Sequence, residues 1–554
     1  METLPPIPGT VQLVDTQGIL NVTHGQGWHD IVLVPQPTDD PDDPLRWSKS
    51  RKRSVIICVM TWCFFIGAMI SGLSPAYILI EEATGISVAD LSTGNGILYL
   101  FMGWGTLITQ SLALKYGRRL MLVVSIIMVT GMTLWTAFVQ SGGEFFANRI
   151  LLGISASPQE TLVEIVIGDV FFTHDRGFYM GAYAWALFCS AFLSPVASGY
   201  VAQYLGWQWI QYILTFVGIA VALMAFFVFE ETMFFRDNAS TMTEILRATS
   251  MISTPKPMEE SVATDKSKKI DEKKTYPPYD QSNMPSFHVS EFSPVRSTKT
   301  YIQKLKLWGF HHPNQPNPFK VFFVPFQLLF MFPALFYSGL LVGGILAWYN
   351  CIGGSLALVL GNEPYNFSTN SIGLVSLASF TGVTIGCCFS GWLSDIIAIR
   401  LARRNGGIME PEQRLWISLI ALVIHPAGCL LYGVGASYGI HWSGVVIGLG
   451  LMTATLPMGS SLAYTYILDT YREMAGEGLV SAILIRNLMG FAFGYAIVPM
   501  MNILGVCYAF VLIAILGEIV WLTSIAMIYF GKPLRRCTAQ KYWNFVEKHE
   551  AKAH

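Results

Sequence analysis

Three ionisable residues stand inside one apolar stretch of the chain, at 146–168, where a charge would have little water to solvate it. Arg149, Glu160 and Glu164 are separated by eleven and four residues, and at about 100° per residue these offsets return within about 20° and 40° of the same helix face. A charge in the middle of a bilayer costs about 3 to 10 kcal/mol, so such residues are retained when they are paired, protonated or functional. The spacing predicts one polar stripe along one membrane helix.

The two carboxyl groups of this stripe, Glu160 and Glu164, lie a single helical turn apart. Two ionised carboxylates at that spacing repel in a medium of low dielectric constant, so at least one is expected to hold a proton. We expect Glu160 to exchange a proton for substrate during function, with Glu164 as its partner or alternate. The alternative is structural: Glu164 would pair with an Arg near the helix end, while Arg149 would counter Glu160, pair with another helix or extend its charge to the membrane surface.

Apolar helices would position this stripe. Hydrophobic residues make up 53% of the 554 residues, charged residues only 13%, and the mean hydropathy is +0.47, which leaves too little polar surface for a soluble protein. A helix needs about 20 apolar residues to cross a hydrocarbon core of about 30 Å. We therefore predict an all-α membrane protein with twelve transmembrane helices in two six-helix bundles, at 53–73, 94–114, 119–139, 146–168, 178–202, 209–229, 321–349, 371–394, 415–435, 443–467, 479–500 and 507–530.

The Lys and Arg residues fall on one side of these stretches. The odd-numbered gaps between them contain no Lys or Arg, whereas the even-numbered gaps and the residues after the last stretch hold the cations. This alternation is typical of a multi-pass membrane protein that keeps its basic loops in the cytoplasm. We therefore expect both termini in the cytoplasm and a lipid bilayer around the helices. The net charge of -1, with its dispersed cations, gives no surface for nucleic acid.

One long gap divides the chain. It is rich in Lys, Ser, Thr, Pro and acidic residues, a composition typical of disorder. The predicted organisation is a cytoplasmic segment at 1–50, a six-helix bundle at 51–232, a disordered cytoplasmic linker at 233–318, a second six-helix bundle at 319–530 and a cytoplasmic tail at 531–554. In the outer gap before the eighth helix, Asn366-Phe367-Ser368 is a glycosylation sequon, so Asn366 is a predicted glycosylation site, whereas Asn238-Ala239-Ser240 should be cytoplasmic and unmodified.

Several short motifs in this arrangement resemble the major facilitator superfamily. The loop signature of that family ends in Gly117-Arg118-Arg119 here, although Gln110 and Leu114 stand where the family has Gly and Asp. Further resemblance comes from Gly391 and Asp395 in the second half, Asn148-Arg149 and Asp169 with Arg176 around the fourth helix, and Pro195 with Gly199 in the fifth, where proton antiporters carry a Gly-Pro motif. The resemblance implies the major facilitator fold.

Two further segments, Asp40–Trp47 and Arg403–Leu415, resemble fungal members of the drug:proton antiporter type 1 group, which includes the yeast polyamine and histidinol transporter. The resemblance implies a proton-coupled transporter of a small organic compound in a fungal plasma membrane. Efflux of a drug-like or specialised metabolite is the first expectation. Uptake of a small cation such as a polyamine, or a nutrient receptor built on a transporter fold, remains the alternative.

In this fold a substrate lies between the two bundles, and aromatic faces suit planar or cationic molecules. The predicted pocket residues are Phe336, Tyr337, Tyr464, Trp185 and Trp104. The predicted gate residues are Gly117, Arg118, Arg119, Asp169, Arg176, Asp395, Asp469 and Arg486, with the last two at the cytoplasmic ends of helices ten and eleven. No phosphate-binding glycine loop or metal-ligand spacing occurs, so we expect no enzyme activity and no cofactor. We expect a monomer whose partners are a small-molecule substrate and protons.

Overall fold

The computed structural model describes residues 7–12, 24–25, 28–32, 40, 42–234, 300, 303, 305–307 and 318–550. Among these residues, eleven helical runs are long and apolar enough to cross a membrane. The last run, α18 (Ala475–Glu550), contains two passages, because the backbone at Gly505 is not helical (φ 78°, ψ 163°). Twelve passages result, as the hydropathy pattern predicts. Most of the predicted linker, 235–299 and 308–317, and the Asn238 sequon lie outside the described residues.

The first six passages are helices with well-defined ends. Ser48 and Ser87 cap the first two with side-chain hydrogen bonds to the helix backbone, and Gly117 and Gly206, both with φ 97°, make the tight turns between adjacent passages. Pro158 interrupts the fourth passage. The helices are α1 (Lys49–Ser71), α3 (Val88–Tyr116), α4 (Arg118–Thr136), α5 (Gly142–Ala156) with α6 (Gln159–Val170), α7 (Arg176–Leu205) and α8 (Trp207–Val228), with η2 (Ser74–Ala76) and α2 (Tyr77–Thr84) between the first two passages.

The last six passages contain more irregular turns. Phe332 has an extended backbone and separates α11 from α12, and two π-helical turns interrupt the eighth and ninth passages. The elements are α11 (Pro318–Met331) with α12 (Pro333–Gly361), α13 (Thr369–Cys388) with η4 (Phe389–Leu393) and α14 (Ser394–Arg404), η5 (Pro411–Ile417) with α15 (Ser418–Cys429), η6 (Leu430–Val434) and α16 (Gly435–Ser437), then α17 (Trp442–Thr470), η7 (Arg472–Met474) and α18.

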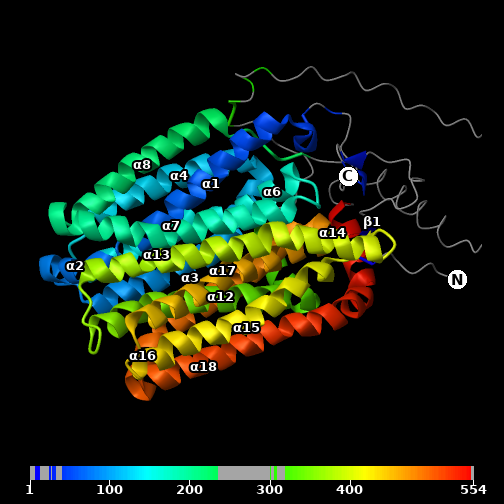
Figure 1. Cartoon of the computed structure of the whole chain (residues 1–554). Helices are drawn as coiled ribbons and strands as arrows, with labels where there is room; N and C mark the ends of the chain where they lie inside the picture. The colour runs from blue at the N-terminus through cyan, green and yellow to red at the C-terminus, as the bar shows by residue number, and fades with distance from the viewer. Residues whose placement is uncertain are drawn as a thin grey trace, which may run out of the picture.

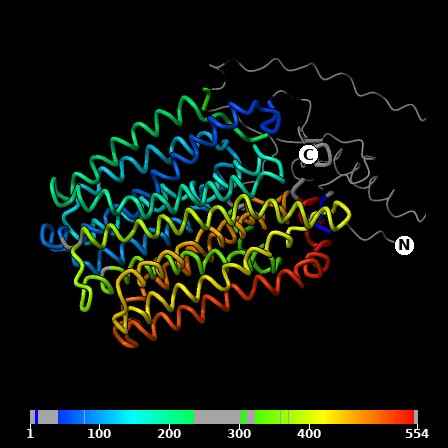
Figure 2. Tube along the Cα trace, in the orientation of Figure 1, coloured from blue at the N-terminus to red at the C-terminus, as the bar shows by residue number. Residues whose placement is uncertain are grey.

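The helices run side by side along one common direction (Figures 1 and 2). Within the first half, α3 packs on α5, α1 on α7 and α4 on α8; within the second half, α12 packs on α18 and α13 on α17. The halves meet where α7 contacts α13 and where α3 contacts α18. The site described below therefore lies between two groups of helices that are each packed internally.

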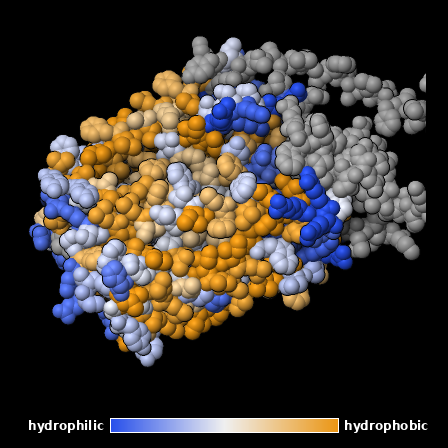
Figure 3. All heavy atoms as spheres, viewed as in Figure 1, coloured by the Kyte–Doolittle hydropathy of each residue, from blue (hydrophilic) through white to orange (hydrophobic). Residues whose placement is uncertain are grey.

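Apolar side chains form a broad band around the middle of the visible face, and hydrophilic side chains gather at its two ends (Figure 3). We call the end that carries Arg118, Arg119, Arg403, Arg404 and Arg535 the basic end. The opposite end, at which α2 and α16 lie (Figure 1), is the cation-poor end. This distribution is that of a protein whose middle faces lipid and whose ends face water.

Two pairs of short strands lie outside the helices. Strand β1 (Val11–Gln12) pairs antiparallel with β4 (Ile408–Met409), which connects α14 to η5. Strand β2 (His24–Gly25) pairs with β3 (Trp28–Val32). The turn η1 (Pro44–Arg46) precedes α1, and Lys52 donates a hydrogen bond to the carbonyl of Leu45 within it. Strand β1 is thus attached to the segment between α14 and η5, and the turn η1 is attached to α1.

Candidate functional site

Glu160 and Arg486 come from opposite halves of the chain and form a buried ion pair. Nη2 of Arg486 lies 2.8 Å from Oε1 of Glu160. Oε2 of the same carboxylate accepts a 2.6 Å hydrogen bond from Nδ2 of Asn487. The Glu160 side chain is 1% exposed, so a charge there must be balanced by protein groups. An ionised Glu160 therefore joins α6 of the first half to α18 of the second.

The close approach of these helices depends on a glycine. A Cβ placed on Gly103 of α3 would lie 2.8 Å from the Cβ of Asn487, a distance that packed side chains do not tolerate. Pro158 interrupts the fourth passage directly before Glu160, and α6 begins at Gln159. Glycine in α3 and proline before α6 therefore set the positions from which Asn487 and Glu160 meet.

Glu164 is fully buried one turn from Glu160, as the spacing predicts. It interacts with Arg486 and with the hydroxyl of Tyr183 on α7, although neither carboxylate oxygen accepts a well-aligned hydrogen bond. Nη1 of Arg486 donates a 3.2 Å hydrogen bond to the hydroxyl of Tyr464 on α17. The guanidinium of Arg486 thus contacts one carboxylate and one phenol and lies within electrostatic range of a second carboxylate, that of Glu164. We call Glu160, Glu164, Arg486, Asn487 and Tyr464 the charged cluster.

Arg149 lies apart from these carboxylates. It is 4% exposed, its guanidinium stacks 4.5 Å from the centre of the Phe145 ring, and it interacts with Tyr77 near the cation-poor end. The helical spacing made Arg149 one candidate for the ion-pair partner of Glu160, but in the structure that partner is Arg486. Arg486 itself lies eleven residues into α18, within the charged cluster, and not at the end of its helix with the other predicted gate residues.

A cavity of about 390 Å³ lies between the halves, toward the cation-poor end. None of its lining residues is Asp, Glu, Lys, Arg or His. Aromatic rings, two amides and several hydroxyl groups make up its walls instead; they include Tyr77, Phe192, Tyr349, Phe491 and Tyr495, Asn95 and Asn350, and Ser71, Ser74, Ser92, Thr93, Ser376 and Ser379. We call this space the Tyr349 cavity.

The Tyr349 cavity lies next to the charged cluster along α18. Asn487 is four residues before Phe491, which lines the cavity, and four residues advance a helix by about 6 Å on the same face. A second connection runs through a hydrogen bond between Tyr349 and Tyr99, and Tyr99 interacts in turn with Glu160 and Arg486. A molecule in the cavity would therefore be one residue layer away from the ion pair.

The five aromatic residues predicted for a pocket are dispersed. Tyr464 lies in the charged cluster. Tyr337 is buried within the second half, where it donates a 2.9 Å hydrogen bond to Ser524, and Trp185 donates a 3.2 Å hydrogen bond to Thr384 between α7 and α13. Trp104 and Phe336 are 48% and 47% exposed. The lining of the Tyr349 cavity is made by other aromatic residues because the helices turn these five toward neighbouring helices or toward the outer surface.

The two halves are joined again at the basic end by a network around Arg414. Asp469 of α17 accepts from Arg414 at 3.1 Å and from Arg176 of the first half at 3.2 Å. Arg414 also pairs with Asp395 and donates a 2.8 Å hydrogen bond to the carbonyl of Thr173. Asp395 in turn accepts a 2.8 Å hydrogen bond from the backbone of Phe178. We call Arg176, Asp395, Arg414 and Asp469 the basic-end network; it links the two halves at this end.

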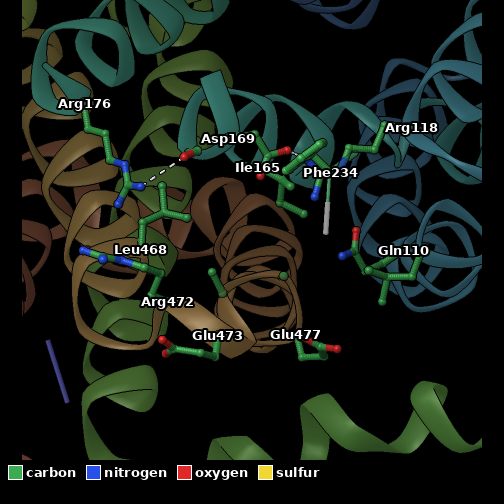
Figure 4. Close-up of a pocket in the computed structure, with 14 residues that line it drawn as sticks. Gln110, Arg118, Ile165, Asp169, Arg176, Phe234, Leu468, Arg472, Glu473 and Glu477 are labelled. Carbon is green, nitrogen blue, oxygen red and sulfur yellow. Dashed lines mark hydrogen bonds and ion pairs between the residues drawn. The ribbon is translucent and has the colours of Figure 1, made fainter. Parts of the chain in front are cut away.

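The remaining predicted gate residues lie beside this network in the first half. Arg118 pairs with Asp169, and the backbone amides of Arg118 and Arg119 each donate a 3.1 Å hydrogen bond to Glu231. Gly117 provides the positive φ that turns the chain from α3 into α4. Arg118 and Asp169 border a cavity of about 330 Å³ between the halves, with Arg176 and Arg472 on one side and Glu473 and Glu477 below them in the view of Figure 4.

Pro195 and Gly199 lie within α7. Pro195 lines the Tyr349 cavity, and the preceding Ser194 donates a 2.9 Å hydrogen bond to the carbonyl of Ala68, joining α7 to α1. Asn366 is exposed in the loop between α12 and α13 at the cation-poor end. Within residues 42–234 and 318–550, no group of three or more His, Cys, Asp or Glu side chains is placed to hold a metal ion.

Sequence reasoning missed Asn487, Arg414 and the cavity residue Asn95. A signal existed for Asn487, since Arg486-Asn487 is a polar pair inside an apolar stretch. Arg414 stands within a run of charged residues at the start of the ninth passage, where its sequence does not distinguish it from a surface Arg. The cavity amides depend on which helix faces meet, which a single sequence does not specify.

The sequence of the chain is similar to those of known membrane transporters. Residues 57–499 match the Major Facilitator Superfamily. An uncharacterized MFS-type transporter of Schizosaccharomyces pombe is 30% identical over 93% of this chain and 90% of its own length. Protein HOL1 of Saccharomyces cerevisiae is 26% identical over 98% of this chain and 97% of its own length, and the MFS antiporter QDR3 of Candida albicans is 21% identical over 91% and 80%.

Solved structures agree on the fold. The proton:xylose symporter XylE matches with a TM-score of 0.57 and 12% identity, over 87% of this chain and 97% of its own. The human organic anion transporter MFSD10 matches with a TM-score of 0.55 and 13% identity, over 85% and 99%. With twelve passages around a buried ion pair and an interhelical cavity, the chain belongs to the major facilitator superfamily, among fungal multi-pass membrane transporters similar to HOL1.

Proposed function

We propose that this transporter exports a small, ring-bearing organic compound in exchange for protons, and that Glu160 carries the exchanged proton. The observation that carries the proposal is the buried pair of Glu160 and Arg486, which joins the two halves at 2.8 Å. One proton that neutralises the carboxylate of such an ion pair would weaken the contact between the two halves. Glu164, one turn away, is the alternate carrier, and Arg149 contributes from the cation-poor end of the same passage.

The proposed coupling follows from the two states of Glu160. When ionised, it accepts from both Arg486 and Asn487, and α6 and α18 are held together. When protonated, it loses its attraction to Arg486, which retains the hydroxyl of Tyr464 as a partner. The connection between the halves then weakens, and the rocking motion that exposes a central site to one side and then to the other becomes easier.

The Tyr349 cavity supports the proposed class of substrate. Its aromatic walls offer stacking surfaces, and its amides and hydroxyls offer hydrogen bonds, but no lining side chain carries a formal charge. A polyamine would bury several ammonium groups without a facing carboxylate, which is costly. A neutral or singly charged molecule with one or more rings fits these walls better, and this favours metabolite or drug export over polyamine uptake.

We further propose that the basic end faces the cytoplasm of a fungal cell, most simply across the plasma membrane, and that the protein works as a monomer. The cation distribution supports this orientation. The basic-end network would then be the inner gate, closed in this structure, and the Tyr349 cavity would lie on the outer side. In this state a proton would arrive from outside and the substrate would leave.

The names of the relatives support proton coupling without fixing its direction. QDR3 is called an antiporter, and XylE a proton:xylose symporter, so exchange and co-transport both occur on this fold. A receptor without flux is the remaining alternative. Direction and flux must therefore be measured on this chain.

The test is the efflux of rhodamine 6G, a ring-bearing monocation, from transporter-deficient yeast that expresses the chain, with the proton gradient intact or collapsed. We expect efflux with wild type, its loss when the gradient is collapsed, and its loss in Glu160→Gln. Glu518→Gln is the matched control, because Glu518 is an intramembrane carboxylate in the last passage that lies outside the charged cluster. Gradient-independent efflux, or full efflux in Glu160→Gln, would exclude Glu160 as the proton carrier.

Spermidine serves as the competitor in the same cells. No effect of spermidine is the expected result for a cavity without carboxylates. Strong competition, together with spermidine accumulation, would instead establish uptake of a polyamine, and the absence of any flux across both probes and a wider panel of aromatic compounds would favour the receptor.

A further inference from the structure

The N-terminal residues 7–12 dock on the second half of the molecule, far from the helix that follows them in sequence. Val11 pairs with Met409 and Gln12 with Ile408 in an antiparallel register. Val11 also packs against the small apolar cluster of Ala398, Ala402 and Met409. Figure 1 labels β1 beside the end of α14 at the basic end. We call residues 7–12 the strap.

The strap completes the surroundings of a buried arginine. Arg535 of α18 is 0% exposed and forms a two-point pair with Glu412, at 2.8 and 2.6 Å. Its third nitrogen donates to the carbonyl of Pro8 at 2.5 Å and to the hydroxyl of Thr10 at 3.3 Å. A buried guanidinium without these partners would pay for its lost hydration. Docking of the strap therefore satisfies a charge that the helices alone leave partly unpaired.

Gly9 brings the strap against the residues that carry the basic-end network. It has φ +79°, and a Cβ there would lie 2.8 Å from Cα of Thr470, 2.9 Å from the carbonyl oxygen of Asp469 and 3.1 Å from Pro411. Only glycine combines this backbone conformation with this approach. Asp469 is itself a member of the basic-end network, and Arg414, another member, follows Pro411 by three residues. The strap thus packs against both segments.

These contacts are few compared with those of a packed helix. Besides the close approach of Gly9, the strap has two residues paired with β4, two oxygens that accept from Arg535, and one apolar side chain in a small cluster. Segments with few buried contacts open at a low free-energy cost. We propose that the strap docks and undocks, and that its docking stabilises the closed basic-end network. Such docking would be independent of proton coupling and of the identity of the substrate.

The experiment measures hydrogen–deuterium exchange of the purified full-length chain at residues 173–178. These residues belong to the first half, receive the contacts of Arg414, Asp395 and Asp469, and have no described contact with the strap. Their exchange therefore reports the network and not the direct loss of strap contacts. Exchange at residues 7–12 reports docking itself, and no substrate is needed.

Gly9→Val is the disrupting variant. We expect exchange at 173–178 to rise about five-fold, the factor that one kcal/mol of lost stabilisation gives. Gly85→Val is the matched control, since Gly85 has a similar φ of +73° but open space around its Cβ; it should leave this exchange unchanged.

A cross-link provides an independent test that adds no bulk. Val11 and Met409 are directly opposed in the ladder, a spacing that a disulfide can bridge. In Val11→Cys/Met409→Cys, with the exposed Cys388 and Cys537 replaced by Ser, oxidation should slow exchange at 173–178 below that of the reduced protein, and a reductant should reverse the change. The proposal would be overturned if residues 173–178 exchanged equally fast in the oxidised and reduced forms. It would also be overturned if they exchanged equally fast in Gly9→Val and wild type although exchange at residues 7–12 showed the strap of the variant to be undocked.

Discussion

Asn487 donates a 2.6 Å hydrogen bond to one oxygen of Glu160, while its neighbour Arg486 lies 2.8 Å from the other. Two consecutive residues of one helix thus hold a single carboxylate of another helix from the opposite half. In a bilayer this arrangement is both a stabilising contact and a point at which one proton changes the interaction between the halves.

Removing either partner of the pair should destabilise the protein unequally. Glu160→Gln removes the ion-paired carboxylate of Arg486, whose positive charge cannot be lost, and leaves the more weakly placed Glu164 to balance it. Arg486→Gln leaves Glu160, which can take up a proton and become neutral. We expect thermal unfolding in detergent to show a larger loss of stability for Glu160→Gln than for Arg486→Gln. The double variant should lose less stability than the sum of the two single losses. Losses that simply add would show that the pair is not energetically coupled.

The space at Gly103 should be required for the hydrogen bond of Asn487. Gly103→Ala places a methyl group 2.8 Å from the Cβ of Asn487, which would push α18 away from α3 and from Glu160. We expect transport of rhodamine 6G to fall several-fold, with a loss of stability of about 1 to 3 kcal/mol for overpacking. Gly131→Ala in α4, whose Cβ would meet nothing within 4 Å, should be neutral or slightly stabilising.

Asp469→Asn should loosen the basic end. Asp469 balances both Arg176 and Arg414, so the amide would leave two buried guanidinium groups with too little negative charge between them. A cysteine at Leu468, which is 4% exposed beside Gly168 of the first half, should then react faster with a maleimide added from the basic end. Asp175→Asn, on a carboxylate that is 52% exposed, is the control and should leave the reaction rate unchanged.

Glycosylation tests the orientation independently of transport. Asn366 is exposed at the cation-poor end, which the proposed topology assigns to the outside. In a fungal host, Asn366→Gln should abolish the shift in electrophoretic mobility that a glycosidase produces in wild type. Asn238→Gln, at the sequon predicted to be cytoplasmic, should retain that shift. A shift that depends on Asn238 would mean that the orientation is inverted.

The helices were predictable because each passage is long, apolar and bounded by charge or by glycine. The hydropathy pattern predicts twelve passages, and their ends agree with the structure within a few residues for most helices. It misses the extension of α12 to Gly361, of the eighth passage to Arg404 and of α18 to Glu550. The end of α18 is polar in sequence and is held by buried side chains such as Tyr542 and Val546. The break at Pro158 follows from the missing amide hydrogen of proline.

The site was only partly predictable. The four-residue spacing of Glu160 and Glu164 is local, and the helix places both in the buried cluster. The partners of Glu160 are 326 and 327 residues away in sequence, so their meeting depends on how two bundles face each other. The same reason explains why Tyr464 lies in the cluster while Phe336 points elsewhere: both are aromatic residues of central helices, and only the rotation of each helix separates them.

The pairing of Glu160 with Arg486 also has an electrical consequence. With Glu160 ionised, the two side chains together carry no net charge; with Glu160 protonated, they carry one positive charge in the middle of the membrane. One elementary charge that crosses a membrane potential of 100 mV changes in energy by about 2.3 kcal/mol. The step in which the protonated pair changes its exposure would then respond to voltage, and the cell's membrane potential, in addition to its pH gradient, would set the rate at which this transporter turns over.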